Sequence, residues 1–118
     1  MPTRRSIVIV FKSDGMGMTG PEGQPLREAL AGKFLALLAD AGELPETICF
    51  YTDGVKLVCE GSPVLDELRA LEDRGVRLVI CKTCIDSFGL ADRVRVGIVG
   101  GMPDIITAMW GADTVLTL

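Results

Sequence analysis

Five short apolar runs rich in β-branched residues recur along the chain, and each of the first four is followed by a helical pattern. The runs cover residues 6–11, 47–51, 76–81, 94–98 and 114–118. The first of them, SIVIVF, is continuously apolar, as in a strand that is buried on both faces of a parallel sheet. The order βαβαβαβαβ with short connections therefore predicts an α/β protein, in which helices cover both faces of a parallel sheet.

The segments between the runs predict four helices. The first is expected to begin at Pro25 and to end before Gly42. Further helices are expected over residues 63–74, 83–90 and 103–110. In the first helix, one stripe of apolar side chains at helical spacing should face the sheet: Leu26, Leu30, Phe34, Leu37 and Ala41.

The length and net charge of the chain restrict the kinds of protein that it can be. A chain of 118 residues is expected to form one domain, residues 1–118, with a real core. The net charge of -4 argues against nucleic-acid and membrane partners, because both bind basic surfaces. The first apolar run ends at Phe11 without a signal-peptide cleavage site, and no run approaches the roughly 20 residues that span a bilayer. We therefore expect a cytoplasmic protein with reduced cysteines.

The chain contains no histidine. This excludes Ser-His-Asp and Cys-His catalytic arrangements as well as metal sites with histidine ligands. Acid–base chemistry would fall to carboxylates, lysines, Tyr51 or the four cysteines, and no cofactor is predicted.

The third apolar run ends in Cys81-Lys82-Thr83-Cys84, a CxxC pair at the point where a strand is expected to pass into a helix. The free N–H groups and the dipole of a helix start favour a thiolate there, and Lys82 adds a positive charge. We expect Cys81 to be the more exposed thiol and the nucleophile. Cys84 would then be a resolving or accessory thiol.

Two other interpretations of this pair stay open. A zinc site would also need Cys49 and Cys59, but these lie ten positions apart and Cys49 is within an apolar run, so no metal is predicted. Both Cys81 and Cys84 could instead be small buried core residues. Cys49 and Cys59 themselves fit a structural role.

The loops after the first three runs contain SDGMGMTG, TDG and CKTC. The carboxyl ends of parallel strands lie at one edge of the sheet, where ligand sites form in such folds. We therefore expect these loops to build a pocket around Cys81, with the following residues as its walls: Ser13, Asp14, Met16, Gly17, Asp53, Gly54 and Thr83.

The first of these loops formally matches G-x-G-x-x-G, a dinucleotide-binding pattern, at residues 15–20. Pro21 and Pro25 delay the following helix by several residues, so its N-terminus should not point at the first two glycines. The preferred interpretation is a mobile flap, in which Met16 and Met18 are adaptable apolar contacts.

Several short motifs, spread over nearly the whole chain, match one family in their order and spacing. They are Ser13-Asp14-x-Met16-Gly17, Leu44-Pro45-x-Thr47-Ile48-x-Phe50-Tyr51, Gly54-Val55-Lys56-Leu57, Glu60-Gly61-Ser62, Cys81-x-Thr83-Cys84 and Gly89-Leu90. With them the chain resembles the DsrE/DsrF-like family. It is most similar to the C-terminal domain of YedF-type proteins, which are sulfurtransferase-like proteins of selenium metabolism.

The resemblance implies a three-layer α/β/α fold with a five-stranded, mainly parallel sheet, and a tendency to form homo-oligomers. It also implies sulfur relay, because Cys81 falls where relay members of the family carry sulfane sulfur as a persulfide and pass it to a partner thiol. YedF-type proteins usually carry a TusA-like N-terminal sulfur-carrier domain, which we do not expect for this protein. The expected partner is therefore a separate sulfur-donor or sulfur-acceptor protein, such as a TusA-like carrier.

Two alternatives to sulfur relay remain. The first is a dithiol–disulfide redox module that uses Cys81 and Cys84 without carrying sulfur. The second is a non-catalytic, oligomeric binding subunit in which the cysteines are inert.

Overall fold

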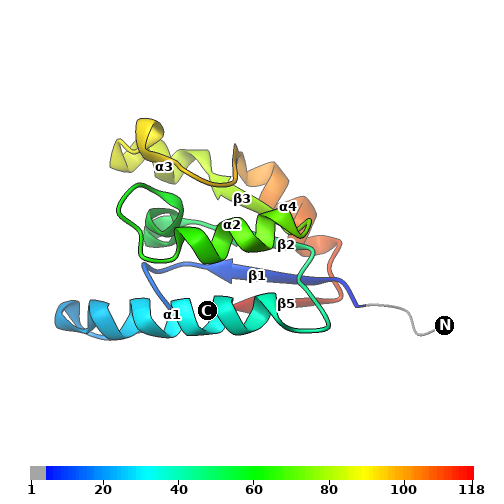
Figure 1. Ribbon diagram of the computed structural model, residues 1–118. Helices are drawn as coiled ribbons and strands as arrows, with labels where there is room; N and C mark the ends of the chain where they lie inside the picture. The colour runs from blue at the N-terminus through cyan, green and yellow to red at the C-terminus, as the bar shows by residue number, and fades with distance from the viewer. Residues whose placement is uncertain (1–4) are drawn as a thin grey trace.

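The computed structural model describes residues 5–118, and its centre is a five-stranded sheet with the strand order β4-β3-β2-β1-β5 (Figure 1). All four pairs of neighbouring strands are parallel. The strands are β1 (Ile7–Phe11), β2 (Thr47–Phe50), β3 (Arg77–Cys81), β4 (Ile98–Gly100) and β5 (Thr114–Thr117). The prediction of an α/β fold with a parallel sheet is confirmed.

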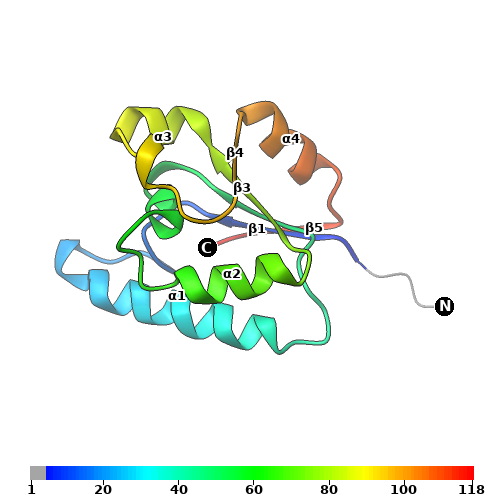
Figure 2. The same ribbon diagram turned by 45° about the horizontal axis from the view of Figure 1, so that its top comes forward.

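The helices form the two outer layers. α1 (Gln24–Ala39) and α2 (Leu65–Asp73) pack on one face of the sheet, and α4 (Met102–Trp110) lies on the opposite face (Figure 2). α3 (Lys82–Phe88) stands beyond the carboxyl end of β3. Short 3₁₀ helices complete the chain: η1 (Pro21–Gly23), η2 (Thr52–Val58) and η3 (Ala91–Arg93). Among the described residues, no helix has the length and apolar character that crossing a membrane requires.

The core lies around the three central strands. The residues of β1, β2 and β3 are almost all buried, which confirms that the first apolar run is covered on both faces. The rings of Phe11 and Phe50 stack with their centroids 5.8 Å apart, where β1 and β2 reach the carboxyl edge of the sheet. Well-packed strand ends give the loops that follow them a fixed base.

The buried stripe of α1 differs from the predicted one. Leu26, Leu30 and Leu37 are exposed, whereas Ala31 and Leu35 are completely buried. Phe34 and Leu38 are partly buried against the same core, so the inward face of α1 is centred on Ala31 and Leu35. On this side Gly32 faces Val64, the residue before α2, and a Cβ on Gly32 would make an ordinary contact of 3.7 Å with the Val64 side chain.

The fourth strand is also shorter than expected. Residues 94–98 do not form one strand, because Val94 pairs with Cys59 in an isolated antiparallel bridge and Gly97 has a φ of +82°. A Cβ at Gly97 would lie 2.9 Å from the side chain of Ile80, so only glycine lets the chain turn this closely onto β3. The strand therefore begins after this turn, at Ile98.

Candidate functional site

The carboxyl ends of β1, β2 and β3 bring three segments together: the loop after β1, the start of η2 and the start of α3 (Figure 1). Two hydrogen bonds made by Thr52 join them. Its backbone N–H donates to the Sγ atom of Cys84 at 3.1 Å, and its hydroxyl oxygen lies 2.6 Å from the carbonyl oxygen of Lys12. The structure thus confirms that the three loops meet at one edge of the sheet.

Cys81 ends β3 and occupies the N-cap position of α3, as the sequence predicts. Only 2% of its surface is exposed, and it belongs to the hydrophobic core. The expectation that Cys81 is the more exposed thiol of the pair is therefore wrong. Cys81 pairs with Gly100 of β4, and η2 packs near β3 and α3, so this strand end lies within the core.

Cys84 lies in the first turn of α3 and is half-buried. Burial raises the pKa of its thiol, the N–H of Thr52 lowers that pKa, and the neighbouring thiol of Cys81 raises it further. The net direction is upward, so the predicted depression of a thiol pKa at this helix start is not found for Cys84. The sulfur is nevertheless within reach of solvent and is held by a directed backbone donor.

Lys82 does not contact the thiols. Its ammonium group lies 2.5 Å from the carboxylate of Asp86, one turn further along α3, and both side chains are exposed. Such an exposed ion pair stabilises a helix only slightly. Thr83 is exposed as well. The residues between the two cysteines thus form the outer surface of α3.

Four of the predicted pocket residues line a common cavity of about 240 Å³: Ser13, Asp14, Gly17 and Asp53. Met18, Thr19, Arg27 and Lys56 complete its lining, whereas Cys81 and Cys84 do not contribute to it. Met16 lines a separate, more apolar cavity of about 310 Å³ with Lys12, Met18 and the C-terminal Leu118. The first of these cavities therefore brings four of the predicted residues together, but it is not the expected pocket around Cys81.

The loop after β1 is fastened to α1. The guanidinium group of Arg27 lies 3.0 Å from the carboxylate of Asp14 and donates to the carbonyl oxygen of Gly20 at 3.0 Å. The backbone N–H of Met16 donates to the carbonyl oxygen of Arg27. These contacts contradict the interpretation of this loop as a loose flap. α1 begins only at Gln24, which confirms the predicted delay of the helix after the glycines.

Gly54 contributes no surface to the cavity because it is buried against the end of β1. A Cβ at this residue would lie 2.7 Å from the carbonyl carbon of Phe11 and closer still to its oxygen. Only glycine permits this approach, and the contact fixes the distance between η2 and the end of β1. The N–H of Gly54 donates to the carbonyl oxygen of Tyr51 at 3.0 Å.

Two residues of the site have no clear signal in the sequence, namely Thr52 and Lys56. The ammonium group of Lys56 lies 2.9 Å from Asp53 and 4.7 Å from the ring centre of Phe88. Phe88 follows Cys84 by one helical turn, so Lys56 links the cavity to the thiol-bearing face of α3. For Thr52 the sequence offers only its place directly after an apolar run, and for Lys56 also its place in the family motif Gly54-Val55-Lys56-Leu57.

The two remaining cysteines lie away from the edge. Cys49 is in the middle of β2, where burial raises its pKa to about 11. Cys59 is buried, its thiol donates to the carbonyl oxygen of Val55, and burial raises its pKa as well. Within residues 5–118, no three Cys, Asp or Glu side chains are grouped so that they could hold a metal ion.

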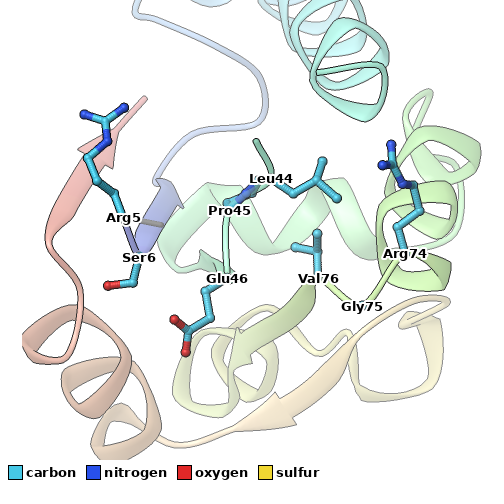
Figure 3. A pocket seen from close by; sticks show the side chains of 8 residues that line it. All are labelled: Arg5, Ser6, Leu44, Pro45, Glu46, Arg74, Gly75 and Val76. Carbon is cyan, nitrogen blue, oxygen red and sulfur yellow. The ribbon is translucent and has the colours of Figure 1, made fainter. Parts of the chain in front are cut away.

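A further cavity, of about 320 Å³, lies at the opposite edge of the sheet (Figure 3). It is formed by the segments before β1, β2 and β3, and Arg5 and Arg74 stand on its two sides with Glu46 below them. The length of a strand, on the order of 15 Å, separates it from the cysteine pair. This cavity therefore does not belong to the site at the carboxyl edge.

The fold and the site together define a class: a small three-layer α/β protein with a pair of neighbouring free thiols at the carboxyl edge of a parallel sheet. The sequence profile of the DsrE/DsrF-like family matches residues 16–118. The chain belongs to this family, which is associated with sulfur relay. A comparison with curated protein sequences gives no match.

Solved structures support the fold. The YchN protein from E. coli superposes with a TM-score of 0.70 at 24% sequence identity, over 97% of this chain and 99% of that chain. Protein MTH1491 from Methanobacterium thermoautotrophicum, of unknown function, gives 0.65 at 17% identity, over 97% and 99% of the two chains. Protein BT1422 from Bacteroides thetaiotaomicron, also of unknown function, gives 0.60 at 16% identity, over 96% and 95%. At these identities the likeness concerns the fold alone.

Proposed function

We propose that this protein is a small cytoplasmic sulfur-relay protein that accepts sulfane sulfur as a persulfide on the Cys81–Cys84 pair. The observation that carries the proposal is the half-buried thiol of Cys84, which is held by the N–H of Thr52 next to a second free thiol. The association of the family with sulfur relay points to the same chemistry. The likeness to YedF-type proteins of selenium metabolism is part of this proposal.

The uptake step needs no cofactor. The thiol of Cys84 loses its proton to solvent, and the thiolate attacks the outer sulfur of a persulfide on a donor protein. A sulfur–sulfur bond forms on Cys84 while the sulfur–sulfur bond of the donor breaks, and the donor leaves as a thiolate. In the release step the thiolate of an acceptor protein attacks the outer sulfur, and Cys84 leaves as a thiolate. A TusA-like carrier is the type of partner that we propose for either step.

The exposure of the two thiols decides which of them meets the donor. The sequence favours Cys81, but its near-complete burial leaves Cys84 as the thiol that a donor can approach. We therefore assign the first acceptance of sulfur to Cys84 and a resolving role to Cys81. The thiolate of Cys81 would attack Sγ of the Cys84 persulfide, which releases hydrosulfide and forms a Cys81–Cys84 disulfide.

Intact-mass spectrometry after incubation with glutathione persulfide tests this proposal. The wild-type chain and Cys49→Ser should gain the mass of one sulfur atom, and Cys84→Ser should not. Loss of the adduct in Cys81→Ser but not in Cys84→Ser would return the acceptor role to Cys81. If neither variant of the pair loses the adduct, or if no adduct forms in the wild-type chain and none in Cys81→Ser, where the resolving disulfide cannot form, the proposal is wrong.

The closeness of the two thiols also supports the redox alternative, in which the pair cycles between dithiol and disulfide. In that case Cys81→Ser should trap mixed disulfides with partner thiols through Cys84. The wild-type pair should then show a reduction potential in the range of cellular dithiols, roughly −120 to −270 mV. Persulfide formation without mixed disulfides would exclude this alternative.

We also propose that the protein forms homo-oligomers through α4 and the neighbouring edge strand β4. Met102, Ile106 and Trp110 make an exposed stripe along α4, and Trp110 is 87% exposed. Between residues 96 and 118 the only charged side chains are those of Asp104 and Asp113, and both accept backbone hydrogen bonds. An apolar surface with few charged groups is typical of contacts between identical chains, and it offers little complement to a charged foreign partner.

A further inference from the structure

Thr52 has a backbone conformation that β-branched residues avoid. Its φ of +49° makes it the only non-glycine residue with positive φ between residues 5 and 118. Left-handed backbone is disfavoured for any residue with a Cβ, and most of all for a branched one. Such a conformation persists where surrounding contacts enforce it, and it is most common at functional sites.

Three contacts enforce this conformation. The hydroxyl oxygen of Thr52 lies 2.6 Å from the carbonyl oxygen of Lys12 and 2.7 Å from that of Tyr51, so its single proton always has an acceptor. The N–H of Tyr51 donates to the carbonyl oxygen of Phe11 at 3.2 Å. Two residues after Thr52, Gly54 lies against the same carbonyl group. Residues 51–54 are thus fixed to the end of β1.

The result is a backbone N–H that points away from η2 and at a sulfur atom 32 residues further along the chain. The distance from N of Thr52 to Sγ of Cys84 is 3.1 Å. A hydrogen bond to a sulfur anion is stronger than one to a neutral thiol, because the acceptor carries charge. This donor therefore favours the thiolate form of Cys84.

We propose that Thr52 is a positioning residue for sulfur transfer: its N–H stabilises the Cys84 thiolate, and its hydroxyl group, bound to the end of β1, aims that N–H. The same thiolate is the nucleophile when sulfur is taken up and the leaving group when sulfur is passed on. One contact thus assists both steps. The role in transfer rests on the proposed function, whereas the contact itself can be tested without any sulfur donor.

The pH dependence of Cys84 alkylation by iodoacetamide, followed by peptide mass spectrometry, tests the contact. In Thr52→Ala the hydroxyl group is lost, and alkylation at neutral pH should become about three- to tenfold slower, with the profile moved to higher pH. Thr52→Ser keeps the hydroxyl group and should restore the wild-type profile. Thr107→Ala, at an exposed threonine of α4, is the matched control and should alkylate like the wild type.

A second measurement holds even if Thr52→Ala fails to fold. In the wild-type chain the amide proton of Thr52 should shift in NMR spectra as Cys84 ionises, and this shift should vanish in Cys84→Ser. An unchanged alkylation profile in folded Thr52→Ala would overturn the proposal. So would a chemical shift of the Thr52 amide proton that does not change when Cys84 ionises. If the contact passes both tests while no persulfide forms, the proposed function fails and the thiolate contact stands.

Discussion

The replacement of Gly54 by alanine tests whether the end of β1 sets the position of the candidate site. A Cβ at residue 54 would lie 2.7 Å from the carbonyl carbon of Phe11 and 3.3 Å from the backbone nitrogen of Lys12. These are backbone atoms at the end of β1 and cannot swing aside as a side chain would. The Phe11 carbonyl oxygen would lie closer still to the Cβ, against 3.4 Å or more for an ordinary contact, so η2 must move outward by on the order of 1 Å.

The loss of folding stability that this movement causes can be estimated. Overpacking a buried site destabilises a protein by typically 1–3 kcal/mol, and backbone neighbours place Gly54→Ala at the upper end, about 3 kcal/mol. For a chain of this length that corresponds to a fall in Tm of roughly 10 °C. The outward shift of η2 should also lengthen the hydrogen bond from Thr52 to Cys84, which is now 3.1 Å between nitrogen and sulfur.

Thermal and urea unfolding, followed by circular dichroism, measure this cost. Gly42→Ala is the matched control, because a Cβ there would meet no atom within 4 Å and its φ is ordinary. That variant should unfold within about 1 kcal/mol of the wild type, or be slightly more stable. If Gly54→Ala and Gly42→Ala unfold at the same temperature, the close approach to Phe11 does not hold η2 in place and the reasoning is wrong.

Two further predictions concern the core and the surface. Burial raises the pKa of Cys49 from 9.0 to about 11, against a smaller lowering effect of Arg77, so the folded state keeps this proton longer than the unfolded chain does. The stabilisation that depends on the protonated Cys49 thiol is complete below pH 9, and it falls by about 2–3 kcal/mol between pH 9 and 11. In urea unfolding, Cys49→Val should lack this part of the fall in stability. An equal fall in the wild-type chain and the variant would contradict the prediction. On α4, Trp110→Lys and Ile106→Lys should each reduce the oligomer to a monomer in size-exclusion chromatography, whereas Lys33→Glu on the exposed side of α1 should not. A wild-type chain that is already monomeric would refute the proposed contact.

The fold could be predicted because its signals are local. Each buried strand is a continuous apolar run, and glycine or proline residues flank the helical segments, so the order of elements can be read without knowing any long-range contact. The strand order could not be read, because parallel strands joined by helices can be arranged in several ways. The buried side of α1 was predicted wrongly for a related reason: it depends on how the helix packs against the sheet and against α2, which are long-range contacts.

The candidate site was predicted in its place but not in its details. Parallel topology places residues 13–17, 52–54 and 81–84 at one edge, and this follows from the sequence pattern alone. Which thiol is exposed does not follow, because it depends on how β4 and the η2 segment pack around the end of β3. The same segment supplies the N–H at Cys84 through a backbone conformation that no side-chain pattern encodes.

The opposing influences on Cys84 suit a thiol that must both take up and release sulfur. A thiolate with a higher pKa attacks more strongly once it is formed, but it is scarcer at neutral pH and leaves more slowly. Burial pushes the pKa of Cys84 upward, and the Thr52 donor pulls it back. In a half-buried position with low local dielectric, a single directed N–H acts more strongly on an anion than it would in water. The geometry of residues 51–54 therefore sets the balance between the two steps, which makes the docking of η2 on the end of β1 the structural feature on which the proposed chemistry depends.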